Sequence, residues 1–448
     1  MHRSGPFRAW SAPGVLALML SIGGCASLTY QAVVSGVEQN LASNHPGAAL
    51  ALLNKASPPN DDRVLYSLDR GMVLRMLGRY RESNAAFEKA KRLMGKYRAI
   101  SISETAAALT LSENLTSYSG DLYEHLLVHV YEGLNYLQMQ DPDSARVEAQ
   151  QIDILLNRVA PDTGRAPHGG DGFARYLSGI IYEANHQYSD AMIAYRKAWQ
   201  AYRAERAPVP RDLEDCLLRL SAHLGLADEH RQWQRRFGDG PWHDFDQVRR
   251  SAQVVLVFSD GLAPARGQSS VTAQSPENGR IYRIALPVAI PRHPASRGAM
   301  LHAGTDASRT ARVENVAEVS VRTLAAKIPL LTARALARNV ARDRMVREAD
   351  KHDEGVGALL NFIGVVTEQA DTRSWRTLPD NIQLARLYLE PGKYPLRADI
   401  LGVGGRVLDQ HDYGTVSVDA GDIDVLGLHW ITYGSAGATG RQAIGRLP

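Results

Sequence analysis

The sequence predicts an α+β chain of several domains, in which an irregular α-solenoid of helical hairpins precedes a mixed β-rich domain with an inserted helical pair. Two observations support this order. Apolar residues recur at helical spacing from residue 30 to about 237, whereas short apolar runs bounded by turn residues follow residue 241. The chain has 448 residues, which is long enough for about two or three domains with separate cores.

The composition narrows the class of protein. Apolar residues make up 44% of the chain and charged residues 22%, which is ordinary for a globular protein and argues against a polytopic membrane protein. The formal net charge is only +3, and arginines are interspersed with carboxylates. A nucleic-acid partner would need a larger or more clustered basic excess, so we expect none.

The first 24 residues have the pattern of a secretory leader. Arg3 and Arg8 give it a positively charged start, and Val15–Leu20 is a short apolar run. A membrane-spanning helix needs about 20 apolar residues, so this run is too short to span a bilayer but suits a signal peptide. We therefore predict a signal peptide over residues 1–24.

The leader ends in Leu20-Ser21-Ile22-Gly23-Gly24-Cys25, which resembles the lipobox of bacterial lipoproteins. Small residues admit the processing peptidase, and the thiol accepts diacylglycerol. A plain signal peptide is the alternative. We predict that Cys25 is acylated and carries more than one fatty-acid chain such as palmitate, because a single chain binds membranes only marginally. Ala26, and not aspartate, follows the cysteine, which resembles the pattern of lipoproteins that go to the outer membrane. The predicted location is therefore the outer membrane, facing the periplasm.

The other cysteine, Cys216, is expected to be a small buried apolar residue.

Self-similarity divides the helical region into hairpins. Residues 179–198 match the tetratricopeptide pattern of small and aromatic residues at six of seven positions, with His186 in place of the turn glycine. Residues 71–90 match at five positions, and residues 133–152 match more weakly, with Gln140 among the departures. Small residues on paired helices allow close approach, and aromatic residues fill the space between hairpins. The predicted repeat-packing residues are Gly71, Gly78, Tyr80, Phe87, Ala90, Gly133, Tyr136, Ala145, Gly179, Tyr182, Tyr188, Ala191, Tyr195 and Ala198.

The predicted repeats are unevenly spaced within a helical domain that covers residues 25–240. An extra helical stretch is expected near 99–117 and a loop over 161–172. Pro46–Ala56 is expected to be a lone helix that caps the stack. Asp212–Gly238 is expected to form the last helical pair.

The predicted C-terminal domain covers residues 241–433, and residues 434–448 are expected to be a disordered tail. Leu330–Lys351 and Gly357–Val366 are expected to be helices, and residues 262–279 a polar loop. Pro391-Gly392 is expected to be a hairpin turn. The expected strands lie at 254–258, 280–290, 313–321, 383–389, 394–401, 414–418 and 423–432.

Two segments contain candidate binding residues. In the first, Tyr118, Tyr123 and Glu124 could form a binding hot spot, because tyrosine provides much contact energy at low entropic cost. The alternative, which we favour, is aromatic packing at a helix start with Ser119 or Asp121 as the N-cap.

In the second segment, Asp371 and Arg373 could form an ion pair that pins a loop while Trp375 plugs it into the β-domain. A ligand site is the less favoured alternative.

The run Asp371-Thr372-Arg373-Ser374-Trp375-Arg376-Thr377-Leu378-Pro379, with Leu389-Glu390-Pro391-Gly392, is similar to a hallmark of a widespread family of proteobacterial lipoproteins. The family has tetratricopeptide-like helices ahead of a mixed C-terminal domain, and its genes often neighbour lipoproteins that activate penicillin-binding proteins. The resemblance implies a place in the cell envelope and cell-wall synthesis machinery as a partner. It implies no established activity.

Motifs for catalysis or cofactor binding are absent from the sequence. There is no phosphate-binding loop, no His-Glu-x2-His zinc motif and no Gly-x-Ser-x-Gly nucleophile elbow. We expect none of the 14 histidines to pair at metal-ligand spacing with another ligand. We predict no catalytic residues, no cofactor and no metal. The predicted function is a non-catalytic, membrane-anchored periplasmic scaffold that binds envelope proteins through its repeats. The alternatives are a peptidoglycan-associated structural lipoprotein acting through its C-terminal domain, or a wall or glycan hydrolase.

Overall fold

The computed structural model describes residues 30–103, 117–159, 170–275, 279, 281–350 and 369–432. The predicted signal peptide, Cys25, the helix expected over Gly357–Val366 and the tail from residue 434 lie outside these ranges. So do most of the stretch near 99–117 and most of the loop over 161–172. Among the described residues, no helix combines the length and the apolar character needed to cross a bilayer.

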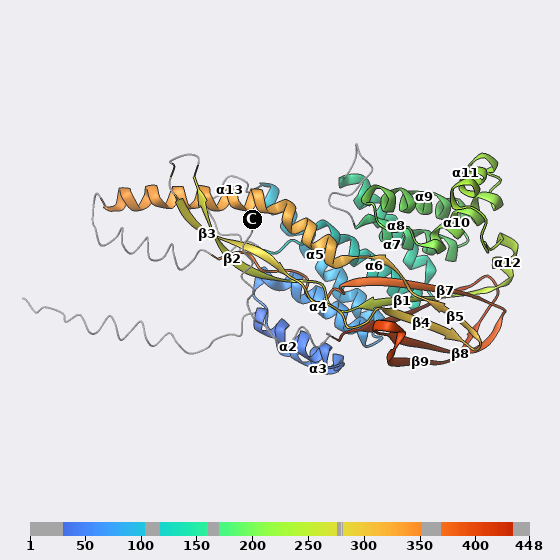
Figure 1. The fold of residues 1–448 in the computed structure, drawn as a ribbon. Helices are drawn as coiled ribbons and strands as arrows, with labels where there is room; N and C mark the ends of the chain where they lie inside the picture. Colours follow the sequence, from blue (N-terminus) through green and yellow to red (C-terminus); the bar gives the residue numbers. More distant parts are fainter. Residues whose placement is uncertain are drawn as a thin grey trace, which may run out of the picture.

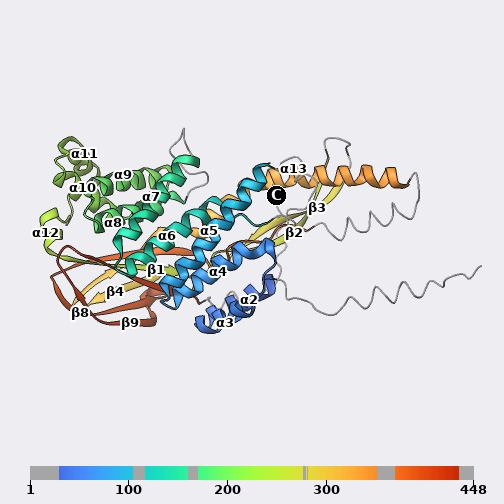
Figure 2. The same ribbon diagram turned by 180° about the vertical axis from the view of Figure 1, so that it is seen from behind.

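The N-terminal half consists of helices paired by short turns (Figure 1). The pairs follow one another along the chain, from blue for the first pair to green for the last (Figure 2). The pairs are α2 (Tyr30–Ala42) with α3 (Pro46–Lys55), α4 (Arg63–Met76) with α5 (Tyr80–Ser103), α6 (Leu122–Gln138) with α7 (Pro142–Val159), α8 (Asp171–Ala184) with α9 (Tyr188–Glu205), and α10 (Arg211–His223) with α11 (Ala227–Phe237).

Each of these pairs turns on a residue with left-handed backbone conformation. The φ angles are 56° at Asn44, 71° at Gly78, 57° at Gln140, 55° at His186 and 67° at Gly225. This conformation ends the first helix, and glycine or asparagine adopts it at little cost. Gln140 and His186 therefore depart from the glycine pattern but keep its conformation. The turn at Asn44 shows that residues 46–55 are the second helix of a pair with α2, so the prediction of a lone capping helix was wrong.

Glycines bring the helices of a pair close together. A Cβ atom added at Gly71 would overlap the ring of Phe87, and one added at Gly179 would overlap the ring of Tyr195. At Gly133 an added Cβ would lie 3.2 Å from Cδ1 of Ile181, in the neighbouring pair. Ala90, Ala145, Ala191 and Ala198, which were predicted to pack, are fully buried.

The aromatic residues of the pattern link one pair to the next. Tyr188 makes edge contacts with the rings of His223 and Phe245, at ring-centroid distances of 5.4 and 4.9 Å. Tyr80 makes its contact within its own pair, because its ring centroid lies 5.8 Å from the guanidinium of Arg75 on α4. Tyr136 and Tyr182 are half-buried against the same core.

The C-terminal half contains two four-stranded sheets and a separate hairpin. The first sheet has the order β10-β1-β7-β6 and the second the order β5-β4-β8-β9, while β2 pairs with β3. Strand β1 is parallel to β10 and antiparallel to β7. A short helix, α12 (Phe245–Arg250), leads into the first strand. The strands are β1 (Ala252–Asp260), β2 (Ala265–Gln274), β3 (Ile281–Ile290), β4 (Gly298–Ala303), β5 (Asp306–Arg309), β6 (Ala311–Glu314), β7 (Asn381–Leu389), β8 (Gly392–Leu401), β9 (Val407–Val418) and β10 (Ile423–Trp430).

The first sheet is the middle of three layers. Every residue of β1 is buried, which explains its nearly continuous apolar sequence. Val254, Leu256 and Phe258 face the second sheet, whereas Val255 and Val257 belong to the core shared with the helices. The helical pairs therefore pack against one face of this sheet, and the second sheet packs against the other (Figure 1).

Two predictions about the C-terminal half were wrong. Residues 313–321 are not one strand, because β6 ends at Glu314 and the long helix α13 (Val316–Asp350) begins two residues later. The Asn315 side chain accepts from the Glu318 backbone N–H at 3.2 Å, which caps the start of α13, and it donates to the Glu318 carboxylate at 2.9 Å. The polar stretch 262–279 contains strand β2, whose residues 265–274 pair in register with residues 281–290.

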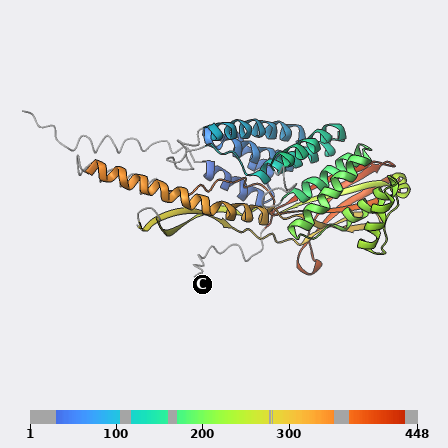
Figure 3. The same ribbon diagram turned by 90° about the horizontal axis from the view of Figure 1, so that it is seen from above.

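Strands β2 and β3 and helix α13 form an extension that we call the arm. Ile284 and Leu286 of β3 pack against Ala335 of α13 in a small core of their own. The arm extends away from the layered body in two perpendicular views (Figures 1 and 3). The helix predicted to begin at residue 330 is thus part of a longer helix that starts at residue 316.

Candidate functional site

The structure brings the two candidate binding segments together. We call residues 370–379 the strap, and we call the side of α4, α5 and α6 that carries Asp69, Phe87, Glu124 and Tyr131 the strap face. The backbone N–H of Trp375 donates to Oε1 of Glu124 at 3.0 Å, although the two residues are 251 positions apart. Predicted binding residues from opposite halves of the chain therefore bind each other.

Trp375 occupies the centre of the strap face. Its side chain is only 2% exposed, and its ring makes edge contacts with Phe87 and Tyr131 at centroid distances of 5.8 and 6.2 Å. Its indole N–H donates to Oγ1 of Thr377 at 3.1 Å. Trp375 thus plugs into the helical pairs and not into the β-domain as predicted, because the large aromatic cavity lies between α5 and α6.

Asp371 and Arg373 form the predicted ion pair at the entry to the strap. The guanidinium of Arg373 makes two contacts with the Asp371 carboxylate, at 2.8 and 2.9 Å. The same guanidinium lies 5.8 Å from the ring centroid of Tyr118, which is a cation–π distance. The pair therefore holds the strap against the loop before α6.

Glu124 lies at the junction of the two segments. Its Oε2 accepts from the backbone N–H of Asp121 at 2.8 Å, which caps α6, and from the hydroxyl of Tyr118. Burial, and then the charge of Asp121, raise the pKa of Glu124 above its usual value. The start of α6 is therefore capped, with Asp121 at the N-cap as the favoured alternative expected, and the Glu124 carboxylate also binds the strap. A binding hot spot for another molecule stays a prediction.

Asp69 is a second carboxylate that receives the strap. Its Oδ1 accepts from Oγ1 of Thr377 at 2.8 Å, and its Oδ2 accepts from the hydroxyl of Tyr30. Burial raises the pKa of Asp69 to about 6, although these hydrogen bonds act in the opposite direction. The backbone N–H of Thr377 also donates to Oδ1, at 3.3 Å. The carboxylate is fully buried, so it depends on these three donors.

The base of the arm is fixed beside the same helix start. The Asp121 carboxylate contacts Arg266 of β2 at 2.6 Å and also the ammonium of Lys327 on α13. Burial alone would raise the pKa of Asp121, but these two cations outweigh it and hold the pKa below its usual value. The hydroxyl of Tyr123 donates to Ser320 of α13 at 3.2 Å. Tyr123 therefore faces the arm and not the strap.

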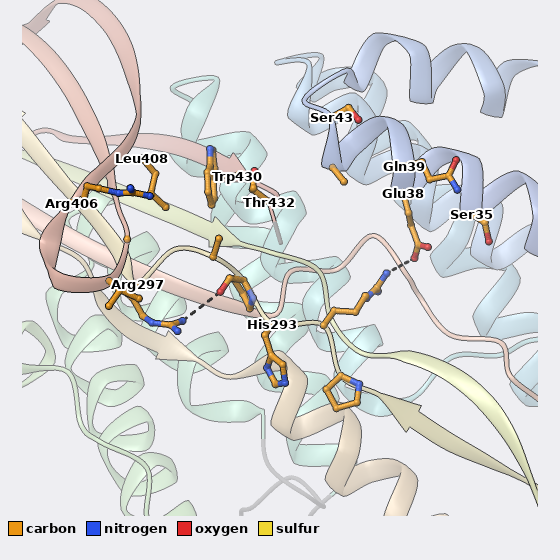
Figure 4. A pocket seen from close by; sticks show the side chains of 17 residues that line it. Ser35, Glu38, Gln39, Ser43, His293, Arg297, Arg406, Leu408, Trp430 and Thr432 are labelled. Atoms are coloured by element: carbon orange, nitrogen blue, oxygen red, sulfur yellow. Dashed lines mark hydrogen bonds and ion pairs between the residues drawn. The ribbon is translucent and has the colours of Figure 1, made fainter. Parts of the chain in front are cut away.

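An open cleft lies beside α2, next to the strap. Its volume is about 1320 Å³. Pockets for small molecules usually measure about 300–1,000 Å³, so this cleft can hold a longer ligand. Figure 4 shows its lining: polar residues of α2 face the side chains of the β-domain across the opening. Helix α2 contributes Ser35, Glu38, Gln39 and Ser43, and the β-domain contributes Arg292, His293, Arg297, Arg406, Leu408, Trp430 and Thr432.

The cleft has an excess of positive charge. Glu38 is paired with Arg292 at 2.5 Å and with Nε of Arg376, in the strap, at 2.8 Å. Arg297 donates to backbone carbonyls, at 3.2 Å to Ser296 and 3.4 Å to Pro294. Within the described ranges, neither Arg297 nor Arg406 has a carboxylate at ion-pair distance. Two cations are thus available to an acidic ligand.

Sequence reasoning missed this cleft because most of its β-domain residues come from segments between the expected strands, far along the chain from α2. The residues 291–297 follow β3, and residues 402–406 form the turn between β8 and β9. Trp430 and Thr432 lie at the end of an expected strand. Arginine and tryptophan in turns that converge from separate strands leave no local signal.

A second cluster of ionisable groups lies between α5, α6 and α7. His129, Glu132 and Glu148 place ligand atoms within 4.8 Å of one another, and His129 and Glu132 are one helical turn apart. The ammonium of Lys91 lies 2.5 Å from Glu132 and 3.5 Å from Glu148, so an internal cation already balances these carboxylates. Burial, and then the neighbouring Glu148, raise the pKa of Glu132 to about 9. The prediction that no histidine has ligand spacing overlooked this helical turn.

Comparisons with known proteins give distant likenesses. No protein-family model matches the chain, and no curated protein matches its sequence. A solved structure of a MamA double mutant is 17% identical, covering 46% of this chain and 89% of that chain at a TM-score of 0.31. MamA from residue 41 onward, from Desulfovibrio magneticus RS-1, is 16% identical, covering 46% and 90% at a TM-score of 0.29. The apo form of RapI is 9% identical, covering 50% and 56% at a TM-score of 0.37.

These neighbours are tetratricopeptide-like repeat proteins. The tetratricopeptide-like arrangement of this chain rests on its left-handed turns and close glycine contacts, because likenesses at such TM-scores are too weak to support it. They also imply nothing about the partners or activity of this chain.

Proposed function

We propose that this protein is a non-catalytic scaffold lipoprotein, tethered at Cys25 to the outer membrane and facing the periplasm, that holds an envelope protein in the cleft beside α2. This proposal depends on one observation: the strap face is occupied by side chains of the same protein, whereas the cleft is not. The strap face is filled by Trp375 and its neighbours, whereas the cleft is open and lined by helical and β-domain residues together.

The lining of the cleft supports a partner with an acidic surface. Arginine and tryptophan are enriched at protein interfaces, and arginine binds carboxylates with two donors at once. Arg297 and Arg406 lie on the β-domain side, and Ser35, Gln39 and Ser43 offer polar groups on the other. The partner is therefore an envelope protein with an acidic extended segment. The family resemblance makes cell-wall synthesis machinery the first candidate.

Photo-crosslinking in living cells tests the cleft. A photoreactive residue at Gln39 or Val403 should crosslink one envelope protein, and the yield should fall several-fold when Arg297→Ala and Arg406→Ala are combined. The control position is Ile154, which is 48% exposed on α7, away from the cleft. Equal crosslinking from Ile154, or a yield that does not respond to the arginine variants, would contradict the proposal.

The tether has its own test. Cys25→Ser should abolish acylation and release the protein from membranes, because the thiol is the group that accepts the lipid. Mass spectrometry of the processed N-terminus and membrane fractionation measure this. Membrane association that is unchanged in Cys25→Ser would rule out the anchor.

A second candidate is a peptidoglycan-associated protein that acts through its C-terminal domain. Trp430, Arg297 and Arg406 all come from that domain, and an aromatic ring beside arginines also suits a sugar face and its carboxylates. Sedimentation with insoluble peptidoglycan separates the two: the scaffold proposal expects no binding, whereas this candidate expects binding that Trp430→Ala weakens. Turnover of labelled peptidoglycan by the purified protein would instead support a hydrolase.

A further inference from the structure

A second pocket lies at the end of the body opposite the arm, where α10, β5 and β7 meet (Figure 1). Its volume is about 460 Å³, which is within the range of pockets that hold one small molecule. It shares no lining residue with the cleft beside α2. Three arginines and two aspartates line it, so its formal charge is +1 when its histidine is neutral.

The two carboxylates of this pocket already have partners. Asp215 accepts from the backbone N–H of His243 at 2.8 Å and lies 3.2 Å from Nδ1 of the same residue. Asp212 pairs with Nε of Arg386 at 3.0 Å and accepts from the hydroxyl of Tyr176. These carboxylates therefore hold α10 against the neighbouring segments, and they leave little capacity for a cationic ligand.

The arginines, in contrast, keep donors without acceptors. In the part of the chain that the structure describes, the side chain of Arg309 makes no hydrogen bond or ion pair. The same holds for Arg211, whose guanidinium lies 5.0 Å from the ring centroid of Trp242. Both are exposed, whereas the Arg386 side chain is 1% exposed and its Nη2 has no hydrogen-bond partner. A buried donor without an acceptor is costly, so the pocket favours a ligand that supplies a negatively charged acceptor.

The rest of the lining combines aromatic rings with neutral polar groups. The rings of His243 and Tyr388 lie against each other with centroids 4.1 Å apart, and Trp242 also lines the pocket. Ser308 on β5 offers a hydroxyl. Since Nδ1 of His243 faces Asp215, its Nε2 is left for a ligand. Rings that pack against C–H groups, next to polar groups that bind hydroxyls, suit a sugar.

We propose that this pocket binds an acidic sugar, with its carboxylate or phosphate paired with Arg211 and Arg309 and its ring against Trp242 and His243. The ligand would join the last helical pair to the β-domain, because the two arginines come from α10 and β5. The site is separate from the cleft, and it requires neither the tether nor an envelope partner.

Isothermal titration calorimetry tests the pocket with the full chain purified in detergent. The probes are glucuronate, which carries a carboxylate, glucose 6-phosphate, which carries a phosphate, and glucose, which carries neither. We expect one or both acidic sugars to bind at least about tenfold more tightly than glucose, because guanidinium groups bind these anions with two donors at once. The tighter of the two identifies the acidic group. Added salt should weaken the binding, since the exposed charges are screened.

The decisive variant combines Arg211→Ala and Arg309→Ala, and it should weaken the binding of the acidic sugar about tenfold or more. The matched control combines Arg203→Ala and Arg236→Ala. These two exposed arginines also lie over a tryptophan, at 5.8 and 4.7 Å from the ring centroid of Trp199, and they are outside the pocket. The control should bind as the parent does, and unchanged unfolding midpoints show that both variants are folded.

Four results would overturn the proposal. The first three are no binding of either acidic sugar, equal binding of glucose, and a pocket variant that binds like the control. The fourth is a loss of binding in Arg297→Ala with Arg406→Ala instead, which would place the anion in the cleft beside α2. Because the assay contains neither a membrane nor an envelope protein, its failure is distinguished from failure of the proposed scaffold function.

Discussion

The strap face and the cleft beside α2 both lie where helices meet the β-domain, but they differ in what occupies them. On the strap face, Trp375, Thr377 and the backbone of the strap satisfy two buried carboxylates and fill an aromatic cavity. In the cleft, Arg297 and Arg406 face solvent. The comparison teaches that helical repeats do not by themselves offer a binding surface, because the chain can supply its own ligand to them.

The largest effect should come from emptying the strap face. Trp375→Ala removes a ring that is 2% exposed and should lower the free energy of unfolding by about 3–5 kcal/mol. Trp430→Ala, on the half-buried wall of the cleft, should cost about 1–2 kcal/mol, because less surface loses its packing. Chemical denaturation of the two variants measures the difference. Equal costs would show that the strap is no more part of the core than the wall of the cleft.

A pH-dependent effect of nearly the same size should follow from Asp69. Its folded-state pKa of about 6 lies above the unfolded value of about 3.9, so the folded state binds more protons between these values. The carboxyl therefore contributes stability below about pH 4 that is lost as the pH rises through about 6. Relative to Asp69→Asn, the native protein should lose up to about 3 kcal/mol between pH 4 and pH 7.

Denaturation curves at several pH values in this range measure that trend. The lost hydrogen bonds of the variant add a constant offset, so the slope with pH is the informative quantity. A difference between the two proteins that does not vary with pH would mean that Asp69 is not buried as described.

A smaller effect separates close helix contacts from open ones. Gly179→Ala forces a methyl group into the ring of Tyr195 and should cost about 2 kcal/mol. Gly95→Ala, where nothing lies within 4 Å of an added Cβ, should be neutral or stabilise α5 by up to about 1 kcal/mol. Thermal unfolding of the two variants checks the sign. A stable Gly179→Ala variant would show that α8 and α9 are further apart than the structure has them.

The sequence predicted the features that depend on local residue spacing and missed the contacts between residues far apart in the chain. Glycine and aromatic spacing indicated the pairs around Gly71 and Gly179, because close packing of adjacent helices is a short-range requirement. The contact between Glu124 and Trp375 spans 251 residues, and nothing in either segment identifies the other. A signal did exist in Asp69, a carboxylate among the apolar positions of α4, since a buried acid needs a donor from elsewhere.

The errors in the C-terminal half have similar causes. The strand β2 is polar at most of its positions, so only its pairing with β3 reveals it. The helix α13 was mistaken for a strand at its start because Val313, Val316 and Val319 are β-branched. Asn315 was a recognisable N-cap residue in the sequence, and its cap on Glu318 outweighs that composition. The arginines of the cleft come from separate turns and could not have been grouped without the fold.

The late position of the strap has a consequence for how the chain matures. Ribosomal synthesis and export both deliver the N-terminal half first, so α4, α5 and α6 wait for residues 370–379 before their interior is complete. A fragment that stops at residue 240 would expose an empty aromatic cavity to water, and the carboxylates of Asp69 and Glu124 would lack the hydrogen-bond donors of the strap. A polypeptide captured by such a fragment would occupy the site that Trp375 fills in the whole chain. Its capture would therefore not identify a physiological partner.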